Sequence, residues 1–153
     1  MGTQQILLIV LSVIIVGAAI AVGITMFNNQ AYSANKSALA ADAQSFGTQI
    51  IQYYKTPTSQ GGNGRDLDTM TAPKIASYIG WTNAAGETVT ENGTYRITAA
   101  GANEIKISGL GKELKSTKYP LVTTTIKLST GEITSVLGEA TLAELPAIAV
   151  AAG

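Results

Sequence analysis

The sequence predicts an α+β fold in which one long N-terminal helix packs on a small antiparallel sheet. Three features predict it: a long apolar run near the N-terminus, an apolar stripe at helical spacing after it, and alternating segments in the second half. We expect two parts. Residues 1–54 form a transmembrane or filament-core helix, and residues 55–153 form a C-terminal globular β-rich domain.

The apolar run covers residues 6–27, and no charged side chain occurs in residues 1–35. At about 1.5 Å per residue, a helix over the run extends roughly 33 Å, which is enough to cross a bilayer core. A cleaved secretory signal normally has a basic segment before a shorter apolar core, and no Lys or Arg precedes this run. A plain membrane anchor fits the length, but the first basic residue is Lys36, so the flanking charges that usually set orientation are missing.

Residues 28–54 continue the helical pattern and contain no proline. Their apolar residues recur at spacings of three, four and seven, which places them on one face of a helix. Lys36 interrupts this stripe, and we expect its ammonium to reach solvent past its aliphatic stem. One helix is therefore predicted from near Met1 to Tyr54, on the order of 80 Å long. The residues expected to pack between helix and sheet are Tyr32, Leu39, Ala43, Phe46, Ile50 and Tyr53.

A loop is predicted at residues 55–64 because it holds a proline, three of the chain's glycines and small polar residues. A short helix should follow from about Thr71 or Pro73 to Ile79, ended by Gly80, with Trp81 as a packing anchor. The carboxylates at positions 66 and 68 do not match a calcium loop, since no glutamate stands at the required offset. We expect a solvated turn in which an aspartate caps the short helix.

The remainder alternates between apolar and polar residues and predicts two hairpins. The first pairs residues 94–98 with 104–108, and the second pairs 121–128 with 133–137. Residues 109–114 are expected to form a connector with at most one helical turn. The apolar tail, residues 145–153, is too short to span a membrane and is expected to form a fifth strand or an arm that docks on a neighbouring subunit.

The composition argues against catalysis. The chain has no Cys and no His, which excludes disulfides, thiol nucleophiles and imidazole acid–base chemistry. Its formal net charge is zero, so nucleic acid is not an expected partner. Gly109-Leu110-Gly111-Lys112 lacks the spacing of a phosphate-binding loop. We therefore expect no cofactor, no metal site, no small-molecule substrate and no enzymatic activity.

An apolar helix that continues as an amphipathic helix under a small antiparallel sheet resembles the type IV pilin family. The likeness covers the whole chain in architecture and residues 1–54 in sequence character. In that family a leader is removed and Met1 would take the first mature position, so either a leader is removed before Met1 or the chain is exported differently. The resemblance also implies that the helices bundle in a filament core with the sheets outside. The chain departs from the family in two ways within this helix. Gln5 stands where the family usually has an acidic residue, and the mid-helix proline is missing. Gly17 and Gly23 occupy the region of that proline and are expected to loosen the helix there.

The resemblance implies a structural subunit that self-assembles into an extracellular filament at the cell surface. Its implied partners are copies of itself in a helical homopolymer, the inner-membrane assembly machinery, and the membrane that holds the precursor before assembly. The alternative is a membrane-anchored pseudopilin or a single-pass binding module of a secretion or uptake machine. The residues expected to build the assembly helix are Gln5, Ile6, Leu8, Ile14, Gly17, Ala21, Gly23 and Phe27.

Overall fold

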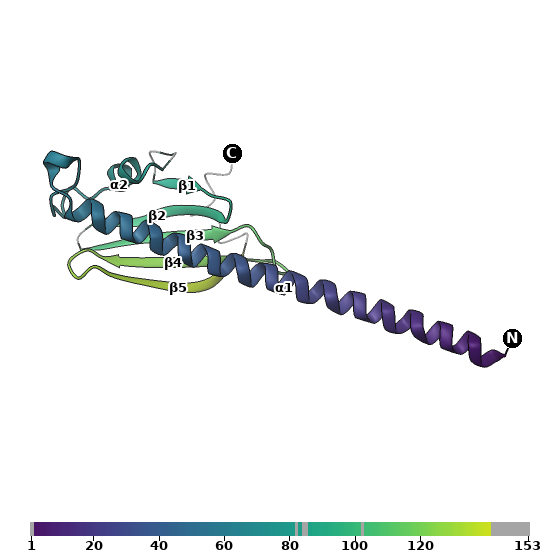
Figure 1. Ribbon diagram of the computed structural model, residues 1–153. Coiled ribbons are helices and arrows are strands. Elements are labelled where there is room, and N and C mark those ends of the chain that lie inside the picture. The colour runs from purple at the N-terminus through teal and green to yellow at the C-terminus, as the bar shows by residue number, and fades with distance from the viewer. Residues whose placement is uncertain (1, 82, 84–85, 102, 142–153) are drawn as a thin grey trace.

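The computed structural model describes residues 2–81, 83, 86–101 and 103–141. Helix α1 spans Thr3–Lys55 without interruption. Its C-terminal half lies across a sheet, while its N-terminal half extends away from the rest of the molecule (Figure 1). The predicted α+β class is confirmed, and the helix ends one residue from the predicted position. Pro57 follows shortly after, and its missing N–H prevents the helix from continuing.

Within the described ranges the sheet has five antiparallel strands, which follow one another in the order β1-β2-β3-β4-β5. Both predicted hairpins are confirmed, as β2–β3 and β4–β5. The sequence did not predict the edge strand β1, because three residues are too few to show an alternating pattern. The strands span Glu87–Val89 (β1), Gly93–Gly101 (β2), Glu104–Gly111 (β3), Lys118–Lys127 (β4) and Glu132–Thr141 (β5).

The expected connector at residues 109–114 is wrong in its first half, because strand β3 continues to Gly111. Gly109 and Gly111 lie in this strand where neighbouring side chains pack too closely for a Cβ. A Cβ at Gly109 would lie 2.6 Å from Cε1 of Tyr95, and one at Gly111 would lie 2.9 Å from Cδ1 of Leu39. Glycine in a strand often marks such a close approach. These two positions therefore let α1 and the β2 tyrosine lie close against β3.

The short helix is confirmed as α2, Ala72–Ile79, with Pro73 in its first turn and Gly80 in the left-handed region at φ 75°. It follows a single 3-10 turn, η1, at Thr58–Gln60. The expectation of an aspartate cap is wrong, since Thr71 precedes α2 and makes no side-chain capping bond.

The loop before α2 is organised instead by a buried Asn63. Its Oδ1 accepts a hydrogen bond of 2.9 Å from Oγ1 of Thr69, and its side-chain amide donates to the carbonyl of Asp66. The predicted apolar tail, residues 145–153, lies outside the described residues.

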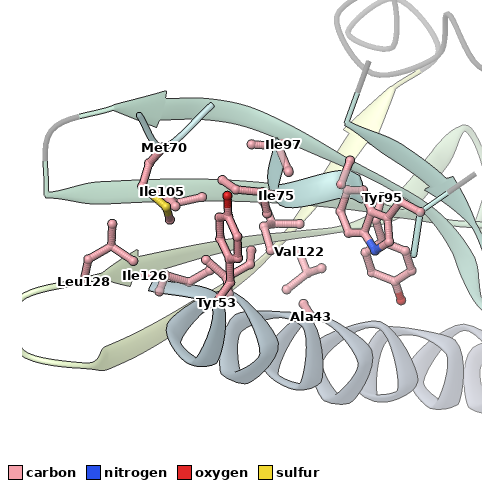
Figure 2. Packing of buried hydrophobic residues seen from close by; sticks show 14 of the residues in the cluster. Ala43, Tyr53, Met70, Ile75, Tyr95, Ile97, Ile105, Val122, Ile126 and Leu128 are labelled. Carbon is pink, nitrogen blue, oxygen red and sulfur yellow. The ribbon is translucent and has the colours of Figure 1, made fainter. Parts of the chain in front are cut away.

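The hydrophobic core lies between α1 and the sheet, and α2 closes one end of it. Figure 2 shows Ala43 and Tyr53 of α1 pointing toward Val122 and Ile126 of β4. Removing one large apolar side chain from water contributes about 1.5–3 kcal/mol, so the amphipathic half of α1 is held firmly on the sheet. The fully buried apolar side chains include Leu39, Ile50, Ile75, Tyr95, Ile105, Ile107, Val122 and Ile126.

Candidate assembly surface

The exposed half of α1, residues 3–30, is the most unusual surface of the molecule. Every residue in it is exposed, and its large apolar side chains are between 49% exposed at Leu11 and 71% exposed at Phe27. By length and composition this part of the helix could cross a membrane. A soluble monomer rarely exposes so much contiguous apolar surface, so this half requires a covering of lipid or protein.

The eight predicted assembly residues all lie in this exposed half, but they do not share one face. Ile14, Gly17 and Ala21 follow one another at spacings of three and four and therefore lie along one side of the helix. Gly23 and Phe27 are also four apart and lie on another side. The remaining three, Gln5, Ile6 and Leu8, are exposed near the N-terminal end. The surface thus encircles the helix, which allows contacts with several neighbours at once.

The glycines of α1 differ in what surrounds them. A Cβ added at Gly17 or Gly23 would meet no described heavy atom within 4 Å, so the isolated chain does not require glycine there. At Gly47 an added Cβ would lie 3.2 Å from Cδ1 of Ile133, which explains that glycine by packing on the sheet. The helix also passes through Gly17 and Gly23 without a break. Small residues at such positions let apolar helices approach each other closely.

Two hydroxyl residues in the apolar run bond to the helix itself. Oγ of Ser12 donates to the carbonyl of Ile9 at 2.8 Å, and Oγ1 of Thr25 donates to the carbonyl of Ala21 at 3.0 Å. These bonds satisfy the hydroxyl donors without water. The run can therefore enter an apolar environment without carrying unpaired hydroxyl protons into it.

The residues predicted to pack between helix and sheet lie in the other half of α1. Phe46 is half-buried, and its ring meets Trp81 and Tyr95 edge-on at centroid distances of 5.2 and 5.1 Å. Lys36 is half-buried as well, at the edge of the stripe. The other five are buried: Tyr32, Leu39, Ala43, Ile50 and Tyr53.

A polar contact between helix and sheet was not predicted from the sequence. Oδ2 of Asp42 accepts hydrogen bonds from the Tyr95 hydroxyl at 2.9 Å and from Nδ2 of Asn92 at 2.8 Å. Nδ2 of Asn35 donates to the carbonyl of Asn92 at 2.8 Å. Burial is the main cause that raises the pKa of Tyr95, and its hydrogen bond to Asp42 raises the pKa further. The spacing could have indicated this contact, because Asn35 and Asp42 lie four and three residues from Leu39 and therefore on the helix face that packs on the sheet.

Charged groups gather where α1 leaves the sheet. Nζ of Lys118 lies 3.4 Å from Oε2 of Glu139 and holds the pKa of that carboxyl below its usual range. The Tyr32 hydroxyl is buried without a well-formed hydrogen bond to any described residue, and burial followed by the charge of Glu139 raises its pKa. Nζ of Lys115 lies 5.8 Å from the centre of the Tyr32 ring. This end of the domain therefore places Lys115 and Lys118 near the point where the exposed half of α1 ends.

Among the described residues, no group of three or more Asp, Glu, His or Cys side chains could hold a metal ion. Glu87 is buried, and its Oε1 lies 3.1 Å from Nε of Arg96 in an ion pair across β1 and β2. Comparison of the chain with protein-family models, curated proteins and solved structures finds no match.

Proposed function

We propose that this chain is the structural subunit of a type IV pilus-like filament, and that it polymerises through the exposed half of α1. The observation that carries the proposal is that one unbroken helix has both an exposed apolar half and a half packed on a folded domain. Residues 3–30 are exposed and apolar on every side, while the rest of the same helix is fixed to a folded domain. Parallel copies can therefore bundle their apolar halves and carry their sheets on the outside.

The apolar half is compatible with both environments that such a subunit meets. In a bilayer it spans the hydrocarbon core, and the subunit waits there as a membrane-anchored precursor. In a helix bundle its side chains are again surrounded by apolar atoms, so transfer from lipid to filament loses little hydrophobic burial. What favours the bundle is close packing between helices, for which Gly17, Ala21 and Gly23 are suited. Many weak contacts repeated along the helix can then offset the freedom lost on assembly.

The remaining parts of the proposal follow from this transfer. A chain that moves from a bilayer into an external polymer needs a machine in the inner membrane to extract it, so we include that machinery among the partners. The location of the finished polymer is then the cell surface. Gln5 is uncharged, so within the first turn of α1 it can offer hydrogen bonds to a neighbouring chain but no ion pair.

Electron microscopy of material sheared from cells that express the chain tests the proposal. We expect thin filaments from the unmodified chain and none from Ile14→Asp, because a carboxylate at the middle of the apolar half is costly to bury in a bundle. The matched control is Val136→Asp, since Val136 is similarly exposed but lies on β5 of the folded domain. The control should form filaments in normal amounts.

Membrane fractionation accompanies the microscopy. One aspartate does not outweigh the insertion energy of the other apolar residues of the run, so Ile14→Asp should still be found in the membrane. If the unmodified chain yields only detergent-soluble monomers while folded and abundant, the filament proposal is wrong. A membrane-anchored pseudopilin, or a single-pass binding module, is then the better description.

A further inference from the structure

The loop between β3 and β4, residues 112–117, reaches α1 where the helix leaves the sheet (Figure 1). Here loop and helix form a shallow groove at the end of the apolar run. It is lined by Thr25, Asn28 and Asn29 of α1 and by Leu114, Lys115 and Ser116 of the loop. The loop therefore lies within about one helical turn of Phe27, where the apolar run ends.

This position corresponds to a definite depth if the run spans a bilayer. A run of roughly 33 Å slightly exceeds a hydrocarbon core of about 30 Å, so the core ends near Phe27. The headgroup layer extends beyond it, alongside the exposed Asn28 and Asn29. The groove thus lies at the boundary between acyl chains and headgroups.

Two side chains of the loop, Leu114 and Lys115, suit this boundary, while the exposed Glu113 beside them carries the opposite charge. Leu114 is 48% exposed at the base of the domain. Its neighbour Lys115 has no carboxylate within ion-pair distance among the described residues, and its ammonium lies over the Tyr32 ring. Lys118, at the start of β4, is paired with Glu139. An exposed leucine beside an unpaired lysine matches an interface where acyl chains lie directly below phosphate groups.

The loop is also held in place. The backbone N–H of Lys115 donates to the carbonyl of Lys118 at 3.0 Å, and the reverse bond measures 3.1 Å. Ser116 takes the left-handed conformation with φ 60°, which closes this turn. Nζ of Lys112 donates to the carbonyl of Thr90 at 2.8 Å and ties the start of the loop to the neighbouring turn. Leu114 and Lys115 are thus presented from a fixed support.

The geometry points to a membrane-seating role for this loop: before assembly, Leu114 enters the acyl-headgroup boundary of an anionic phospholipid bilayer and Lys115 binds lipid phosphate. The inference rests on the membrane-embedded stage of the proposed function. It deepens that stage, because it fixes the height of the folded domain above the bilayer and the tilt of α1 within it.

Single-cysteine spin labelling tests the inference, since the chain has no cysteine of its own. The full chain carries a nitroxide at Leu114→Cys and is reconstituted in vesicles of phosphatidylcholine, with or without about a third phosphatidylglycerol. Collision rates with oxygen and with a water-soluble nickel complex report the depth of the label. We expect the label at 114 to be protected from nickel several-fold more than a label at Val136→Cys on β5. Adding Lys115→Glu should reduce that protection, and more so in the anionic vesicles.

A label at Ile14→Cys separates failure of this inference from failure of the proposed function. If the Ile14 label lies deep in the bilayer while the Leu114 label is as accessible to nickel as the Val136 label, the loop does not seat on the membrane and the anchoring stage stands. If the Ile14 label is also accessible, the anchoring stage itself is wrong. If the Leu114 label is protected only in assembled filaments, the loop contacts a neighbouring subunit and the lipid inference is overturned.

Discussion

The hydroxyl of Tyr95 donates a hydrogen bond of 2.9 Å to Oδ2 of Asp42, and this bond joins a buried residue near the start of strand β2 to helix α1. The same carboxylate oxygen accepts a second bond from Asn92 in the turn that precedes β2. The packing of Leu39 against Gly111 and of Gly47 against Ile133 already limits the position of α1 along the sheet. This directional contact adds to that packing in fixing the register of α1 against the strands, and hence the length of helix that projects from the domain.

Removal of the carboxylate should destabilise the domain. In Asp42→Ala the Tyr95 hydroxyl and the Asn92 amide lose their acceptor in a partly buried site, so we expect a loss of about 2–3 kcal/mol in the free energy of unfolding. Denaturant unfolding of the full chain in detergent micelles measures it. Gln44→Ala, at an exposed position of the same helix, is the matched control and should change stability by less than about 0.5 kcal/mol. Equal effects of the two substitutions would show that the contact does not hold the helix.

Stability should fall at alkaline pH. The pKa of Tyr95 is raised above its ordinary value of 10.0 by burial and by Asp42, and burial also raises the pKa of Tyr53. Below about pH 10 these tyrosines are protonated in both folded and unfolded chains, so their contribution is fully present. As the pH rises from 10 toward the folded-state values, only the unfolded chain loses protons, and the contribution is lost.

Unfolding midpoints measured between pH 8 and pH 12 test this. Tyr95→Phe should be less stable at pH 8, because one hydrogen bond is missing, yet lose less stability above pH 10. An unchanged alkaline slope in that variant would mean that Tyr95 ionises in the folded chain as readily as in the unfolded one.

Gly109 should be intolerant of a methyl group. A Cβ at this position would lie 2.6 Å from Cε1 of Tyr95 and 2.8 Å from Cγ1 of Val122, both in the core. We expect Gly109→Ala to cost about 1–3 kcal/mol, since the tyrosine ring must shift. Gly138→Ala on β5 is the control, because the nearest described atom to its Cβ is the carbonyl oxygen of Leu121 at 4.0 Å. Thermal melts of the two variants should therefore differ clearly, and similar midpoints would contradict the packing described.

Substitution of Gly17 and Gly23 should affect assembly and leave the subunit intact. Leucine at either position meets no described atom of the same chain within 4 Å at its Cβ, and it preserves the apolar character of the run. We expect Gly17→Leu/Gly23→Leu to fold and enter membranes normally but to form few filaments, because close approach between helices is blocked. Sheared yield measured by microscopy, normalised to membrane content, is the readout. Normal filament yield would show that these glycines do not lie at helix contacts.

Local periodicity was sufficient to predict the elements that extend over many residues. The helix to Tyr54 and both hairpins follow from patterns that repeat several times along the chain, and the short helix follows from the residues that begin and end it, Pro73 and Gly80. The connector at residues 109–114 was wrong because the reason for its glycines lies in Tyr95 and Leu39, which are distant in sequence. Local composition alone therefore predicted a loop at residues 109–111, which form the end of strand β3.

The polar contacts were missed for a related reason. Asp42 reads as a solvated residue until Tyr95 is placed opposite it, and Glu87 reads as a loop residue until Arg96 pairs with it across β1 and β2. The first contact joins segments far apart in sequence, and the second depends on the pairing of β1, which the sequence did not predict. The exposed half of α1 was simpler to predict, because an apolar segment without an amphipathic pattern carries its information locally.

The strand order has a consequence for how the chain reaches its folded state. Each strand pairs with the next one along the sequence, so the sheet can form by a succession of short loop closures. The contact between α1 and β5 joins the elements that lie farthest apart along the chain. During synthesis α1 emerges before the strands, because it precedes them in the chain, and its apolar half can partition into a bilayer before any strand exists. In the proposed function, the apolar half can therefore enter the membrane before the domain folds, and the amphipathic half then offers a surface on which the strands pack.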